Sequence, residues 1–96
     1  MVKALRLESS VEAELITRVK AAGGIAEKVT TLGRRGFFDR LIVLPGGRVI
    51  FAEIKRPEGG KISPHQIQRH AVYRRLGVEL RLIRHSKDID RLLGVE

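Results

Sequence analysis

Residues 37–55, FFDRLIVLPGGRVIFAEIK, contain two apolar stretches joined by Pro45-Gly46-Gly47. Proline presets φ for a turn, and glycine accepts the positive φ that a three-residue hairpin loop requires near its end. The pattern therefore predicts an antiparallel hairpin, with one strand over 37–44 and the other over 48–55. This is the strongest local structural signal in the chain, and the other elements are placed around it.

The predicted hairpin would bring two acidic side chains together. If Leu44 faces Arg48, stepping outward one residue at a time along both strands brings Asp39 opposite Glu53 on one face. Their Cβ atoms would lie roughly 4.5–5.5 Å apart. Lys55 shares this face, because it lies two residues beyond Glu53. Opposed carboxylates repel, so the pattern indicates either a site for a hard divalent cation or a solvated Asp39 beside a Glu53–Lys55 ion pair.

The remaining sequence supplies helices and further strands. Apolar residues at helical spacing predict a helix over 9–22, with Ser9 or Ser10 as its cap and Gly23-Gly24 after its end. The other predicted elements are a strand over 25–30, a basic loop over 31–36, a helix that begins at Ser63-Pro64 and runs to Leu76, a strand over 78–84 and a helix over 86–93. The order α-β-β-β-α-β-α predicts an α/β fold, with one domain over 1–96 and a sheet flanked by helices.

The charge balance favours an anionic partner. The chain has 96 residues, with 19 Lys and Arg against 11 Asp and Glu, a net charge of +8. No apolar run is long enough to span a bilayer, so nucleic acid is a better partner than a membrane. We expect a cytosolic protein of a bacterium or a phage-infected host. The absence of cysteine excludes disulfides and thiolate zinc sites, and His65, His70 and His85 are expected at the surface without a metal role.

Four motifs follow one another in order along residues 8–85. They are Glu12-x-x-Leu15 with Gly23-Gly24, then Gly36-Phe37-Phe38-Asp39-Arg40, then Glu53-Ile54-Lys55, and Ser63-Pro64-His65-Gln66. Together they resemble the virus-type replication-repair nuclease (VRR-NUC) domain, a branch of the PD-(D/E)xK nucleases related to archaeal Holliday-junction resolvases. The chain departs from the family pattern at Phe38, where the family usually has a proline before the metal-binding Asp.

The resemblance implies a restriction-endonuclease-like core, with a central mixed sheet flanked by helices, and a Mg²⁺- or Mn²⁺-dependent DNA endonuclease. Asp39, Glu53 and the backbone carbonyl of Ile54 would bind the metal, and Lys55 would be the catalytic lysine. Glu12 would complete the acidic cluster, either directly or through water. Two other acidic residues, Glu8 and Glu14, compete for that role, although the spacing to the glycines favours Glu12 in the resolvase-like pattern.

The second predicted helix presents a polar and aromatic face. Gln66, Arg69, His70 and Tyr73 lie on it at helical spacing. By resemblance, Gln66 would orient Lys55 or the attacking water. The simpler alternatives are a first-turn polar residue for Gln66 and a partly buried core position for Tyr73.

Basic residues flank the motifs and would hold phosphates around the carboxylates. The candidates are Lys28, Arg34, Arg35, Arg40, Arg56, Lys61 and Arg69. DNA affinity should then fall steeply with salt. No base-reading motif is present, so recognition of a branched DNA shape is favoured over recognition of a sequence. Cutting both strands of a four-way junction needs two active sites, so a homodimer fits the resolvase resemblance.

Three classes of function remain open on the sequence. The favoured one is a structure-selective endonuclease that resolves Holliday junctions, with a flap or nicking nuclease as its nearest variant. A non-catalytic nucleic-acid-binding module would explain the charge equally well, but not the opposed carboxylates. A structural subunit that contacts an acidic protein would show no DNA affinity at moderate salt.

Overall fold

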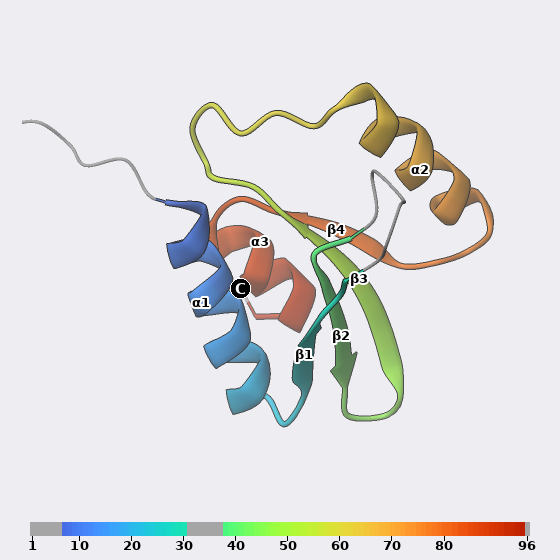
Figure 1. The fold of residues 1–96 in the computed structure, drawn as a ribbon. Coiled ribbons are helices and arrows are strands. Elements are labelled where there is room, and N and C mark those ends of the chain that lie inside the picture. Colours follow the sequence, from blue (N-terminus) through green and yellow to red (C-terminus); the bar gives the residue numbers. More distant parts are fainter. Residues whose placement is uncertain (1–6, 31–37, 96) are drawn as a thin grey trace, which may run out of the picture.

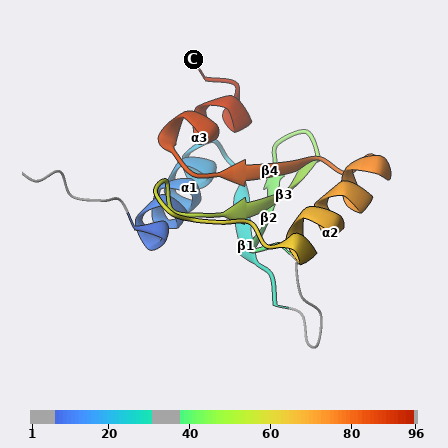
Figure 2. The same ribbon diagram turned by 90° about the horizontal axis from the view of Figure 1, so that it is seen from above.

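The computed structural model describes residues 7–30 and 38–95, which form a four-stranded sheet with helices on both faces (Figures 1 and 2). The elements are α1 (Glu8–Ala21), β1 (Ile25–Lys28), β2 (Arg40–Leu44), β3 (Arg48–Ile54), α2 (Pro64–Arg75), β4 (Leu80–Ile83) and α3 (Ser86–Leu93). The strand order is β1-β2-β3-β4, in which only the β3–β4 pair is parallel. The predicted α-β-β-β-α-β-α order and the mixed sheet are confirmed.

The central hairpin has the predicted turn and register. Leu44 pairs with Arg48, and the ladder continues from there to Arg40 opposite Ala52. Gly46 and Gly47 both have positive φ, which explains the two glycines in the loop. β3 is an inner strand of the sheet. The register of the hairpin therefore fixes which β3 residues point to each face.

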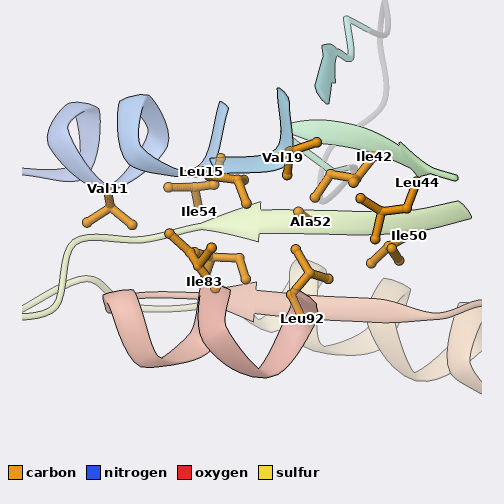
Figure 3. Close-up of a cluster of buried hydrophobic side chains, with 11 residues drawn as sticks. Val11, Leu15, Val19, Ile42, Leu44, Ile50, Ala52, Ile54, Ile83 and Leu92 are labelled. Atoms are coloured by element: carbon orange, nitrogen blue, oxygen red, sulfur yellow. The ribbon is translucent and has the colours of Figure 1, made fainter. Parts of the chain in front are cut away.

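The face covered by α1 and α3 is the hydrophobic core (Figure 3). Its buried members are Val11, Leu15, Val19, Ile42, Leu44, Ile50, Ala52, Ile54, Ile83, Ile89 and Leu92. On β3 these are the even-numbered residues, so the odd-numbered ones point to the opposite face. That face is covered by α2, whose buried side chain is His70 rather than an aliphatic residue.

The helix boundaries agree with the sequence patterns, with one correction. α1 begins at Glu8 after Leu7, and its N-cap makes no side-chain hydrogen bond, so the predicted cap at Ser9 or Ser10 is wrong. Those serines lie inside the first turn, where Glu8 is placed favourably for the helix dipole. For α2 the predicted Ser63 cap is confirmed, with Pro64 at the first helical position.

The strands are shorter than their sequence patterns. β1 ends at Lys28, β2 begins at Arg40, and β4 spans Leu80–Ile83. The predicted basic loop over 31–36, with Phe37 after it, lies outside the described residues. In the part of the chain that the structure describes, no helix has the length and apolar character needed to cross a membrane.

Candidate active site

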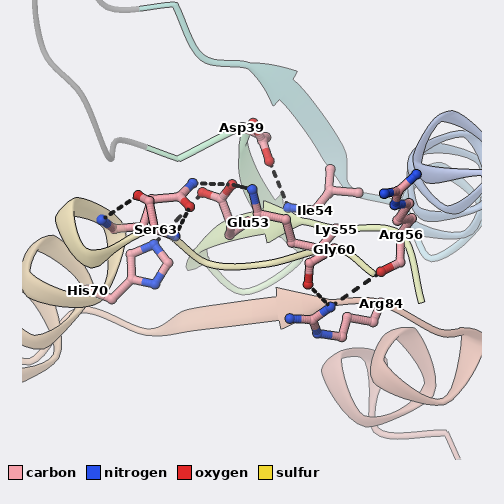
Figure 4. Close-up of polar contacts among 10 residues, drawn as sticks. Asp39, Glu53, Ile54, Lys55, Arg56, Gly60, Ser63, His70 and Arg84 are labelled. Atoms are coloured by element: carbon pink, nitrogen blue, oxygen red, sulfur yellow. Dashed lines mark hydrogen bonds and ion pairs between the residues drawn. The ribbon is translucent and has the colours of Figure 1, made fainter. Parts of the chain in front are cut away.

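Glu53 lies near the end of β3, on the face that α2 covers, and only 2% of it is exposed (Figure 4). One carboxylate oxygen, Oε1, accepts a hydrogen bond from Gln66 Nε2 at 2.8 Å. The Nζ atom of Lys55 lies 3.7 Å from the same oxygen. The other oxygen, Oε2, is buried and has no hydrogen-bond partner among the described residues.

Asp39, the second acid of this site, is the residue just before β2. Its backbone N–H donates to the carbonyl of Ala52, although Ala52 pairs with Arg40 in the ladder. The predicted direct pairing of Asp39 with Glu53 is therefore not part of the ladder, which is offset by one residue at this end. Instead, the Asp39 side chain turns along the hairpin, and Oδ2 accepts a hydrogen bond from the N–H of Ile54 at 2.7 Å.

The charge of Asp39 nevertheless affects the pKa of Glu53. Burial, together with the nearby negative charge of Asp39, raises the pKa of Glu53 to about 8. Lys55 and Gln66 act in the opposite direction but do not compensate. A buried carboxyl with one unsatisfied oxygen beside a second carboxylate is the electrostatic pattern that a divalent cation relieves. The donor set, all hard oxygens, fits Mg²⁺ or Mn²⁺.

Gln66 joins the site to the start of α2. Its backbone N–H donates to Ser63 Oγ, and its Oε1 accepts from the N–H of Ser63, which forms a reciprocal capping box. Its Nε2 remains for Glu53. The sequence pattern predicted that this residue faces the site, but it contacts Glu53 and not Lys55.

An aromatic cluster lies beside Glu53 between β3 and α2. The Phe38 ring stacks on the rings of Phe51 and His70, with 4.6 Å and 5.4 Å between ring centroids. The Tyr73 ring meets Phe38 edge-on, with 5.0 Å between centroids. The surface position predicted for His70 is therefore wrong: it is 3% exposed. Burial lowers the pKa of His70, and the charges of Arg74 and Lys55 lower it further. His65 and His85 are exposed, as expected.

The chain is similar to a phage protein and to a solved structure. No protein-family model matches the sequence. A protein named "Putative nuclease p44" from Acyrthosiphon pisum secondary endosymbiont phage 1 is 42% identical over 86 residues, which is 90% of this chain and 90% of the phage protein. A solved structure described as a VRR_NUC domain matches with a TM-score of 0.83 and 33% identity, covering 91% of this chain and 94% of that one. This chain belongs to the VRR-NUC family.

In this VRR-NUC chain, Glu12 is not gathered with the other two acids. Its Oε2 accepts a hydrogen bond from Arg40 Nε at 2.8 Å. Within residues 7–30 and 38–95, no three acidic or imidazole side chains converge into a metal-binding group. Of the competing acids, Glu8 is exposed, while Glu14 bonds to Arg18 and Ser86 at the junction with α3. Glu12 therefore remains the acid placed near the Asp39 end of β2.

The predicted DNA-binding residues differ in what they contact. Lys28, Arg56 and Lys61 are exposed. Arg40 is bound to Glu12 and to the carbonyl of Ala26, and Arg69 donates to the Tyr73 hydroxyl at 3.0 Å. Arg34 and Arg35 lie outside the described residues. The side chains of the two lysines and Arg56 are therefore open to solvent, where a phosphate can reach them. In this VRR-NUC chain the charge of Arg40 is already paired with that of Glu12.

The aromatic packing around the candidate site of this VRR-NUC chain was not predicted from the sequence. Phe38, which replaces the usual family proline, is a buried aromatic that fixes the chain just before Asp39. The signal was present, because His70 lies four residues after Gln66 and therefore on the same helix face. What the pattern could not show is that this face turns inward.

Proposed function

We propose that this VRR-NUC protein is a metal-dependent DNA endonuclease that hydrolyses phosphodiester bonds. The observation that carries the proposal is Glu53, a buried acid with an unsatisfied oxygen, held between Asp39 and Lys55 in a basic protein. A carboxyl kept in this environment costs folding free energy. Such a cost is typical of functional sites, where perturbed pKa values gather.

The chain's own groups would hold the cation. Asp39 and Glu53 supply carboxylate oxygens, the backbone carbonyl of Ile54 is the third candidate ligand, and Glu12 is the outer acid. A divalent cation bound there would supply Lewis-acid stabilisation of the negative charge that develops on the attacked phosphate. The Ile54 N–H keeps one Asp39 oxygen fixed, so the other is available on the side of the ion.

Lys55 and Gln66 support the reaction from the two sides of Glu53. The Lys55 side chain is 19% exposed, and its Nζ atom lies 3.7 Å from Glu53 Oε1. It can orient a water or stabilise charge on the phosphate. Gln66 donates to Glu53 Oε1 and thereby holds that one oxygen in place.

We further propose branched DNA as the substrate, with Holliday-junction resolution by a homodimer as the favoured form. The support is the resolvase-like motif set, the basic composition and the lack of a base-reading motif. A flap or nicking nuclease is the alternative within the same chemistry. A non-catalytic DNA-binding module is disfavoured, because binding phosphates gives no reason to bury Glu53 beside Asp39.

The test uses labelled four-way junction, flap and linear duplex DNA, each with Mg²⁺, Mn²⁺ or chelator. Wild-type protein is compared with Asp39→Asn, and the molecular mass in solution is measured by light scattering. We expect metal-dependent cutting of the junction that is lost in the variant, and a mass of two chains.

Each other result removes one part of the proposal. Equal cutting of all three substrates would retain the nuclease but remove selectivity. Cutting of the flap alone would select the flap nuclease. Tight binding without cutting under either metal would contradict the enzyme and leave the binding module.

A further inference from the structure

His70 faces the unsatisfied oxygen of Glu53 (Figure 4). Its Nε2 atom lies 3.8 Å from Glu53 Oε2, and both side chains are almost fully buried. Neither atom has a hydrogen-bond partner among the described residues. Two buried polar atoms of complementary kind thus point at each other across a gap slightly too long for a hydrogen bond.

Among the described residues, packing against the aromatic cluster holds the imidazole ring in place. It stacks almost parallel to Phe38, with 15° between the planes, and Phe38 in turn stacks on Phe51. A phenylalanine at position 70 would stack equally well and would bury no polar atom. The packing therefore accounts for a flat ring at this position but not for an imidazole, because leaving a buried nitrogen unsatisfied costs stability.

We propose that His70 is a positioning residue that donates from Nε2 to Oε2 of Glu53 and fixes this carboxylate for a bound divalent cation. The inference rests on the proposed function. It adds a residue outside the motifs from which the site was predicted.

Two donors from one helix would then hold the two oxygens of one acid. Gln66 and His70 are one turn apart on α2, so both side chains reach the same point on β3. The terminal torsion of a glutamate is broad, and a single hydrogen bond to Oε1 leaves Oε2 free to swing. The second donor removes that freedom. Contacts of this kind are often long without ligand and shorten when the site is filled.

The experiment separates the polar role from the packing role with two substitutions. His70→Phe keeps the aromatic stack and removes the donor, whereas His70→Gln keeps a donor and removes the stack. The matched control is His65→Phe, at an exposed histidine of the same helix. Each full-length variant is measured for thermal stability, for Mn²⁺ binding by calorimetry, and for kcat and KM on the DNA substrate that the wild-type protein cuts.

We expect His70→Phe to be as stable as the wild type or more so. Its Mn²⁺ affinity and kcat should both fall by about 10–100-fold, the usual effect of losing a partner behind a metal ligand, with KM for DNA unchanged. His70→Gln should recover most of the Mn²⁺ affinity despite lower stability. His65→Phe should change none of these quantities.

Wild-type Mn²⁺ affinity and kcat in His70→Phe would overturn the inference and leave a stacking role. Equal loss in the Phe and Gln variants would overturn it as well, because packing would then be the cause. If the wild type binds Mn²⁺ without cutting any DNA, the proposed function fails while the calorimetry still decides the role of His70. If it binds no Mn²⁺, both fail.

Discussion

The two faces of the sheet are built from alternate residues of one strand, yet they differ in almost every physical property. Toward α1 and α3, β3 presents Ile50, Ala52 and Ile54, which are all buried in an aliphatic core. Toward α2 it presents Phe51 and Glu53, in a layer of rings, an acid and an imidazole.

The difference shows how so small a chain can maintain a costly site. The buried core cluster of the aliphatic face consists of apolar side chains, so its burial contributes stability without the cost of unsatisfied polar side chains. Among the described residues, the α2 face has buried polar atoms without hydrogen-bond partners on Glu53, Arg69 and His70. The apolar core thus lies on one side of the sheet and the candidate active site on the other, and the two should respond differently to substitution.

The largest expected effect is on the α2 face. Lys55→Met keeps the packed stem and removes the charge, and should lower kcat by about 10²–10³-fold, in line with the loss of one charge-stabilising group. Thermal stability should change little. The control is Lys61→Met, at an exposed lysine of the following loop, which should lower kcat much less. Equal kcat losses in the two variants would indicate a general effect of charge on DNA binding.

The matching change on the aliphatic face is Leu15→Ala. Leu15 is fully buried between α1 and the sheet. Its truncation should lower the free energy of unfolding by about 2–5 kcal/mol, measured by urea denaturation. Val49→Ala, at a half-exposed strand position, serves as the control with a much smaller loss. At low temperature, kcat per folded molecule should stay near wild type; a large drop would mean that the two faces are coupled.

The third prediction concerns pH in the presence of chelator. The folded pKa of Glu53 is about 8, against 4.5 for the ordinary carboxyl. Between these values the folded state binds more protons than the unfolded chain, so stability is full below pH 4.5 and falls as the pH rises through about 8. Glu53→Gln should remove this decline and raise Tm at pH 8, by about 4–8 °C for each 1 kcal/mol of stability recovered in a domain of this size. Parallel Tm curves for the two proteins from pH 5 to pH 8 would contradict the shift.

The smallest expected effect is at Glu12, on the helix that covers the aliphatic face. Glu12→Gln weakens the ion pair with Arg40, in which both side chains are partly exposed, so the free energy of unfolding should fall by at most about 1 kcal/mol. As an outer acid, its loss should lower kcat by about 10-fold. Glu8→Gln, at an exposed acid, is the control. If kcat is unchanged, Glu12 serves only to hold Arg40.

The sequence predicted what depends on local rules. The turn at Pro45-Gly46-Gly47, the Leu44–Arg48 register and the Ser63 cap each follow from a few adjacent residues, and all three were confirmed. The family resemblance, whose motifs extend over most of the chain, was also confirmed by the similar phage protein and the solved structure.

The sequence did not predict what depends on contacts between distant segments. At Asp39 the ladder is offset by one residue and the side chain accepts from the Ile54 amide, and no strand pattern encodes either feature. The ion pair of Glu12 and the burial of His70 likewise depend on how the helices dock on the sheet. The chemical roles of the site residues stay predictions, which the experiments above address.

The side chain of Gln66 serves two structures with its two ends, closing the first turn of α2 and holding Glu53. The hydrogen bonds at the start of α2 therefore depend on the position of Glu53. If Glu53 moves away from Gln66, the side-chain amide of Gln66 can rotate. The backbone N–H of Ser63 then loses its hydrogen bond to Gln66 Oε1 and is open to solvent. Hydrogen exchange at that single amide should follow the occupancy of the site from several residues away, on a timescale set by local opening and not by catalysis.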